Sequence, residues 1–115
     1  MNEIWKDIPD YEGVYQASTL GRIRSLDRVV EVRYMDGKVR QQRRKGKILR
    51  AYMGPYKFWT VTLYRQSESI ELFVHRLVAI TFLENPKNFT QVTFKDGDIN
   101  NITIENLKWG RTANE

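Results

Sequence analysis

Oxygen-bearing side chains recur near the C-terminus, at Asp96, Asp98, Asn100, Asn101 and Asn106. Carboxylate and amide oxygens are the ligands that magnesium and calcium prefer, so this series is a candidate cation site. Asp-Gly is however a common turn pair, and Asn side chains in loops often hydrogen-bond to backbone groups. We therefore expect Asp96-Gly97 to form a turn and the three asparagines to stabilise the loop around it.

His75 is the only histidine and hence the only imidazole available as a general base. It lies in a segment with apolar residues at Val74, Leu77, Val78 and Phe82, a spacing that predicts an amphipathic helix over residues 74–82. A lone histidine at the start of such a helix usually has a structural role. We expect His75 to be a framework residue.

The elements around these side chains are predicted to be short antiparallel hairpins. Asn85-Pro86 should end the helix, residues 91–95 should form a strand, and residues 107–110 the strand that returns to it. Upstream, the β-branched and aromatic residues of 58–65 predict a strand that pairs with residues 70–73 across a turn at 66–69.

The first half predicts a second set of strands. Residues 21–26 alternate apolar Ile23 with Arg22 and Arg24, which is typical of a half-buried strand with a basic outer face. Residues 28–35 and 38–42 flank Asp36-Gly37, which predicts a hairpin with a two-residue turn. The expected fold is a small single α+β domain of antiparallel β-hairpins with one main helix.

Composition restricts the class of protein. With 115 residues and 41% hydrophobic residues, the chain can bury one modest core, and without cysteine it can form neither disulfides nor thiolate zinc sites. Residues 1–10 do not resemble a secretory signal, and the longest apolar stretch, residues 72–83, is too short to span a bilayer. We expect a protein of the cytoplasm that does not enter membranes.

Positive charge is concentrated between Arg22 and Arg50. This segment holds eleven basic and three acidic residues, whereas the rest of the chain holds eight basic and eleven acidic residues. A local net charge of +8 on a segment that alternates like a strand favours contact with a polyanion over a solvated hairpin that happens to be basic. The expected nucleic-acid contacts are Arg22, Arg24, Arg28, Arg33, Arg40, Arg43, Arg44, Lys45 and Lys47. Gln41 and Gln42 are candidates for reading base edges.

Two ordered segments resemble the HNH homing endonucleases of phages and mobile introns. The first is similar to their amino-terminal NUMOD-type motif: EIWKDIP at residues 3–9, YEGVYQAS at 11–18 and GRIRS at 21–25. The second comprises VHRLVA at residues 74–79, Asn85-Pro86, Asp96-Gly97, Asn100-Asn101 and NLKW at 106–109. The resemblance covers the whole chain and divides it into the motif at 1–26, a basic hairpin extension at 27–50 and an HNH-like region at 51–115.

The resemblance implies a site in which a hairpin and a following helix hold one magnesium ion, with a histidine as general base. At the positions of the first ligand and of the base, however, this sequence has Thr93 and Phe94. Asn114 falls at the second ligand position, and only Glu115 follows it, so we expect a ββα-metal-like hairpin truncated at its final helix. No catalytic residue is intact in this reading.

We therefore expect an HNH-like, DNA-binding protein of phage or mobile-element type that does not cleave and needs no cofactor; magnesium would serve any residual nuclease activity. Two alternatives stay open. One is an active endonuclease whose site is completed by another subunit, and the other is a phage module that binds a host protein. The sequence fixes neither the oligomeric state nor the DNA sequence that would be recognised.

Overall fold

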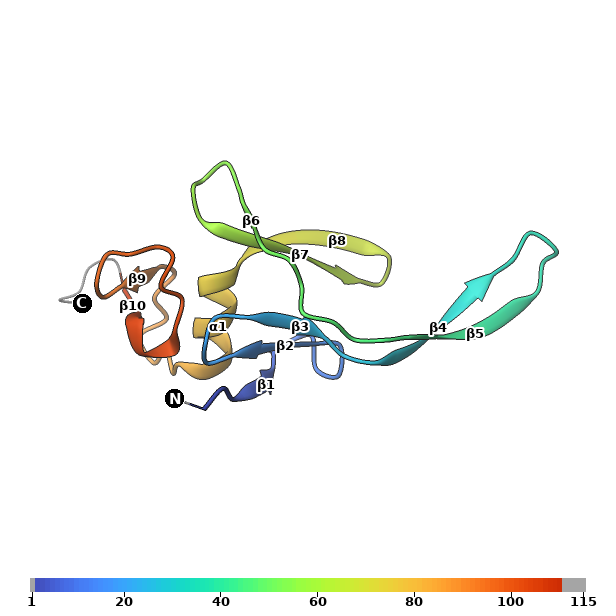
Figure 1. Cartoon of the computed structure of the whole chain (residues 1–115), viewed down its shortest axis with the longest axis horizontal. Helices are drawn as coiled ribbons and strands as arrows, with labels where there is room; N and C mark the ends of the chain where they lie inside the picture. The colour runs from blue at the N-terminus through green and yellow to red at the C-terminus, as the bar shows by residue number, and fades with distance from the viewer. Residues whose placement is uncertain (1, 111–115) are drawn as a thin grey trace.

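The computed structural model describes residues 2–110, which form a body and one long arm (Figure 1). Two three-stranded antiparallel sheets build most of the body. The first has the order β1 (Trp5–Asp7), β2 (Tyr15–Ser18), β3 (Ile23–Ser25), and the second has the order β6 (Tyr52–Met53), β7 (Trp59–Arg65), β8 (Glu68–Phe73). Both sheets contact the single α-helix, so the helix joins them into one unit.

The helix α1 (Val74–Phe82) follows β8 without a loop and leads to the C-terminal hairpin. This hairpin consists of β9 (Val92–Phe94) and β10 (Leu107–Trp109), with the short 3-10 helix η1 (Ile104–Asn106) before β10. The hairpin packs beside α1, on the side of the molecule opposite the arm (Figure 1). The helix has its predicted bounds, because its apolar stripe faces a core on several sides.

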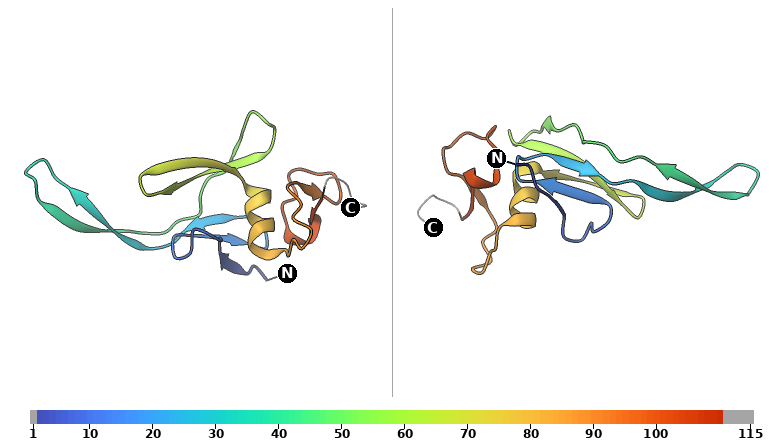
Figure 2. Two further views of the ribbon diagram at one scale, coloured as in Figure 1. Left: turned by 180° about the vertical axis from the view of Figure 1, so that it is seen from behind. Right: turned by 60° about the horizontal axis from the view of Figure 1, so that its bottom comes forward.

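The arm is the hairpin of β4 (Arg28–Arg33) and β5 (Val39–Arg44), joined by the loop at residues 34–38. We use the name arm for residues 28–44. All views in Figures 1 and 2 show it projecting away from both sheets. It gives the molecule a long dimension of 60 Å against 31 and 25 Å for the other two. Every residue of β5 is exposed.

The core lies where the two sheets meet α1. On the strands it takes alternate residues and on the helix it takes one stripe, because these periods place side chains on one face. Its buried members are Ile8, Tyr15, Ala17, Ile23, Val61, Leu63, Val74, Leu77, Val78, Phe94 and Leu107. Tyr15 ties the two sheets together further, since its hydroxyl accepts a hydrogen bond from the backbone N–H of Tyr64 at 3.0 Å.

The α+β class, the antiparallel hairpins and the single helix are confirmed, but two predicted turns are wrong. In the arm, Tyr34 N–H donates to Lys38, and only Gly37 has a positive φ, so the loop holds three residues and is not a two-residue turn. Between β7 and β8 the turn is shorter than predicted. Gln66 and Ser67 both adopt positive φ and alone connect the strands.

Two further elements escaped prediction: β6 is too short to show a period, and η1 is a single turn. In the described range, residues 2–110, no helix is long and apolar enough to cross a membrane.

Candidate nuclease-like site and candidate nucleic-acid interface

Phe94 lies on the inner face of the C-terminal hairpin. It ends β9, opposite Leu107 of β10, and is only 9% exposed. Its ring is nearly parallel to that of Phe58 at a centroid distance of 6.2 Å, and it lies 4.8 Å from the ring of His75. With Phe73, these residues form what we call the aromatic cluster: Phe58, Phe73, His75 and Phe94. The position expected to carry the general base is thus filled by a buried hydrocarbon ring.

His75 is buried at the start of α1, inside this cluster. Its ring stacks on that of Phe73 at 5.4 Å, and its Nδ1 has no hydrogen-bond partner within residues 2–110. Burial, with a smaller effect of the charge of Arg76, lowers the pKa of His75 to about 4. The imidazole is therefore neutral at pH 7. Its burial among aromatic rings agrees with the framework role expected for it.

Thr93, at the expected first ligand position, uses its hydroxyl in the fold. The hydroxyl donates a hydrogen bond to the backbone carbonyl of Gly110. Phe94 offers no lone pair, and within residues 2–110 no group of three His, Cys, Asp or Glu side chains is placed to hold a metal ion. Asn114, the expected second ligand, lies outside the described residues. The side chains at 93 and 94 do not fit a magnesium site.

The acidic loop after β9 is held by its own hydrogen bonds. Asn106 is buried, accepts from the backbone N–H of Asp96 at 3.0 Å and donates to the carboxylate of Asp96 and to the carbonyl of Asn101. The amide of Asn101 also donates to Asp96. These bonds, with one from the backbone N–H of Asp98, lower the pKa of Asp96. The turn at Asp96-Gly97 is confirmed, since Gly97 has a φ of +76°.

Asn100 departs from the role expected for it. Its side chain accepts a hydrogen bond from the indole N–H of Trp59 at 2.7 Å, and so links the loop to β7 rather than serving the loop backbone.

The arm is anchored to the first sheet by continued strand pairing. Leu49 N–H donates to Ile23, and Ser25 N–H donates to Lys47, so the chain leaving the arm lies beside β3. Asp27 caps the junction by accepting from the backbone N–H of Gly46 at 2.6 Å. The basic arm is thus held in one direction by the sheet that carries it.

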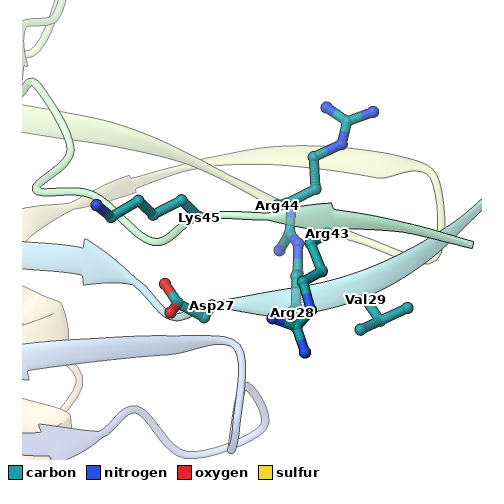
Figure 3. Close-up of a pocket in the computed structure, with 6 residues that line it drawn as sticks. All are labelled: Asp27, Arg28, Val29, Arg43, Arg44 and Lys45. Atoms are coloured by element: carbon teal, nitrogen blue, oxygen red, sulfur yellow. The ribbon is translucent and has the colours of Figure 1, made fainter.

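At its root the arm borders an open concavity of about 530 Å³. Asp27, Arg28, Val29, Arg43, Arg44 and Lys45 line this concavity (Figure 3). Four of these six residues are basic. The structure therefore brings part of the expected nucleic-acid contact set together at one place.

Arg22 and Arg24 have different surroundings. Arg24 lies over the ring of Trp5, 4.2 Å from its centroid, and donates two hydrogen bonds to Oε1 of Gln16. Arg22 pairs with Glu3 and lies 5.4 Å from the same ring, and its hydrogen bond is the main reason that the pKa of Glu3 falls to about 2. Both guanidinium groups are already engaged within the fold, on the first sheet and not on the arm.

The remaining seven members of the expected set lie on the arm or in the segment that follows it. Lys38 belongs with them, because it sits opposite Tyr34 at the tip of the arm and is exposed. The signal for it was its position directly after Gly37, where a strand must restart. Trp5 was expected to be a core residue, but it is only half-buried and supports Arg24 outside the core cluster.

Comparison with known proteins gives relatives of one kind. The sequence profile of the NUMOD4 motif matches residues 3–64. The chain is 31% identical over 105 residues to DNA endonuclease I-HmuI of Bacillus phage SP01, an alignment covering 91% of this chain and 51% of the phage protein. It is 34% identical over 74 residues to the uncharacterized HNH endonuclease L245 of Acanthamoeba polyphaga mimivirus, which covers 64% of this chain and 22% of that protein.

A solved structure agrees with these alignments. It reports DNA binding and cleavage by the HNH homing endonuclease I-HmuI, and it matches this fold with a TM-score of 0.69 at 31% identity, over 93% of this chain and 52% of that one. The chain thus spans about half the length of the phage enzyme. It belongs to the NUMOD4 motif family and is a homologue of the HNH homing endonucleases.

Proposed function

We propose that the chain binds duplex DNA through the arm and the basic segment that follows it. The observation that carries this proposal is a hairpin with six fully exposed residues in β5, standing clear of the body and bearing most of the positive charge of the molecule. A two-stranded ribbon is one of the elements that fit the major groove of B-DNA. That two relatives carry DNA endonuclease in their names or titles supports the same partner.

We further propose that the chain does not cleave the DNA it binds. The support is chemical: Phe94 cannot accept a proton, and the hydroxyl of Thr93 is occupied by Gly110. Loss of a positioned general base alone costs about 10²- to 10⁴-fold in rate. In this proposal the protein acts where phage DNA is found, in the cytoplasm of a bacterial host.

The binding test is a titration of a fluorescent duplex with the purified chain at several salt concentrations. If about five phosphates are contacted, the plot of log affinity against log salt concentration should have a slope near −4.5. Reversing the charge of Arg43, Arg44 and Lys45 should weaken binding at every salt concentration. The matched control is the triple variant Lys6→Glu, Lys57→Glu, Lys87→Glu, which reverses three exposed charges on the body. No binding at low salt, or equal losses in the two triple variants, contradicts the proposal.

The cleavage test uses the same preparation with supercoiled plasmid and magnesium or manganese. We expect no nicking above that of a mock preparation. Nicking would instead support an active nuclease completed by a second subunit. Capture of a host protein by the nuclease-treated chain, together with no DNA binding, would support the protein-binding alternative.

A further inference from the structure

The two glutamines of the arm point to opposite sides of it. Neighbouring residues of a strand alternate between faces, and residues directly opposite in an antiparallel pair share a face. Gln42 pairs with Val30, whereas Gln41 pairs with Glu31. Of the two candidates for reading base edges, only one can therefore face a duplex that lies along one side of the arm.

The pairing register defines the two faces completely. The first, which we call the Gln42 face, holds Arg28, Val30, Val32, Arg40, Gln42 and Arg44. The second, the Gln41 face, holds Val29, Glu31, Arg33, Val39, Gln41 and Arg43. Figure 3 shows the same alternation at the root, where Arg43 and Arg44 point to opposite sides of β5.

The faces differ in charge. The Gln42 face has three arginines and no acidic residue, whereas the Gln41 face has two arginines and Glu31. Gln42 is flanked on its own strand by Arg40 and Arg44, so its amide lies between two cations. A phosphate backbone is attracted to the face with the higher positive charge, and an acidic residue within a face repels it.

The faces also differ in how they treat their valines. On the Gln42 face, Val30 and Val32 are half-buried, and every residue opposite them on β5 is long and polar. On the Gln41 face, Val29 and Val39 are 57% and 48% exposed. The Gln42 face thus presents polar and cationic groups to solvent, which suits a partner made of phosphates and base edges.

Arg40 is held in place on that face. Its guanidinium lies 4.8 Å from the ring centroid of Tyr34 and 3.9 Å from the carboxylate of Asp36. A cation stacked on an aromatic ring keeps its outer N–H groups free to donate. The side chain therefore loses less conformational entropy when it binds a phosphate.

At the root, the Gln42 face borders a hollow of about 480 Å³ whose other walls include Asp10 and Glu12. These carboxylates lie on the body, and Arg28 and Val30 line the same hollow. The stretch best suited to phosphates is accordingly the outer part, at Arg40, Gln42 and Arg44.

From these observations, and resting on the proposed DNA binding, we infer that the Gln42 face is the side of the arm that lies against the duplex. Gln42 is then the base-reading glutamine and Gln41 points away from the DNA. A glutamine in the major groove pairs with adenine, through its N6 and N7 atoms. The specificity contributed by the arm is thus a preference for adenine opposite Gln42.

The first test compares two double variants that each remove two charges, Arg40→Gln with Arg44→Gln and Arg33→Gln with Arg43→Gln. The salt dependence of binding to a random-sequence duplex is measured for both. The Gln42-face pair should reduce the magnitude of the log–log slope by about 1.8, since each lost phosphate contact removes about 0.9. The Gln41-face pair should leave the slope close to that of the unchanged chain.

The second test selects duplexes from a randomised pool with Gln42→Ala, Gln41→Ala and the unchanged chain. Gln42→Ala should lose about tenfold in preference for adenine at one position, and Gln41→Ala should keep that preference. Equal or reversed effects of the two alanine variants, or a larger slope change in the Gln41-face pair, overturn the assignment of the face while DNA binding stands. If the unchanged chain binds no duplex, the proposed function itself fails.

Discussion

The ring centroids of Phe94 and His75 lie 4.8 Å apart, so the only histidine of the chain packs directly against the residue at the expected general-base position. Neither ring reaches solvent to a useful extent, since Phe94 is 9% and His75 is 5% exposed. A general base must contact the water it activates. The aromatic cluster therefore closes this position to water as well as removing the proton acceptor.

Restoring the family residues should not restore cleavage. In the double variant Thr93→Asp, Phe94→His, the new imidazole would replace a ring that contacts Phe58 and His75, and would remain out of contact with water. We expect no magnesium-dependent nicking of supercoiled plasmid, with duplex binding equal to that of the unchanged chain as the control. Strong nicking by the double variant would show that the cluster does not close the site.

Phe94 should be important for stability. It is buried between Phe58, His75 and Leu107, so Phe94→Ala leaves a cavity that these neighbours cannot fill. Large aromatic-to-alanine changes in cores cost about 3–5 kcal/mol. Urea unfolding should show a loss in this range, and Phe94→Leu should lose much less because it retains most of the volume. A loss below about 1 kcal/mol for Phe94→Ala would contradict the packing described.

His75 should make the fold sensitive to acid. Its pKa is about 4 in the folded chain against 6.5 in the unfolded chain, so the unfolded state binds the proton more readily. The stabilising contribution is fully present above pH 6.5 and is lost progressively as the pH falls towards 4. It amounts to at most about 3 kcal/mol.

The measurement is the free energy of unfolding in urea between pH 7 and pH 4, for the unchanged chain and for His75→Phe. Carboxylates titrate in the same range, so the informative quantity is the difference between the two proteins. That difference should change steadily below pH 6.5 in favour of His75→Phe. A constant difference would mean that His75 is equally basic in both states.

How far the sequence predicted this molecule depended on the range of the interaction. The helix at Val74–Phe82 was predicted correctly, because its stripe and the following Asn85-Pro86 are local signals. The turn at Gln66-Ser67 was missed, since neither residue is the usual choice where φ is positive. Here the pairing of β7 with β8 overrides the local preference.

The site followed the same rule. That Phe94 replaces a histidine is visible in the sequence, but the stacking of Phe58 and His75 on it joins residues from three separate segments. The contact of Arg24 with Trp5 is equally non-local, because it depends on the register of β1, β2 and β3. Charge clustering located the arm, but only the pairing of β4 with β5 assigned its residues to faces.

Gly21 should tolerate no side chain. It has a φ of +83°, and a Cβ added there would lie 2.8 Å from Cβ of Ile102 and closer still to the carbonyl oxygen of the same residue. Because Ile102 is packed against the core, it cannot move away without disturbing the loop before β10. Gly21→Ala therefore combines backbone strain with a clash, and we expect it to lower the free energy of unfolding by about 3 kcal/mol or more.

Gly13→Ala is the matched control for this prediction. Gly13 has a similar φ of +77°, but a Cβ there would meet no atom within 4 Å. This variant carries only the cost of the left-handed backbone, about 1 kcal/mol. Urea unfolding of both variants separates strain from contact: the excess loss in Gly21→Ala measures how tightly the segment before β3 is packed on Ile102. Equal losses would mean that the two segments do not meet as described.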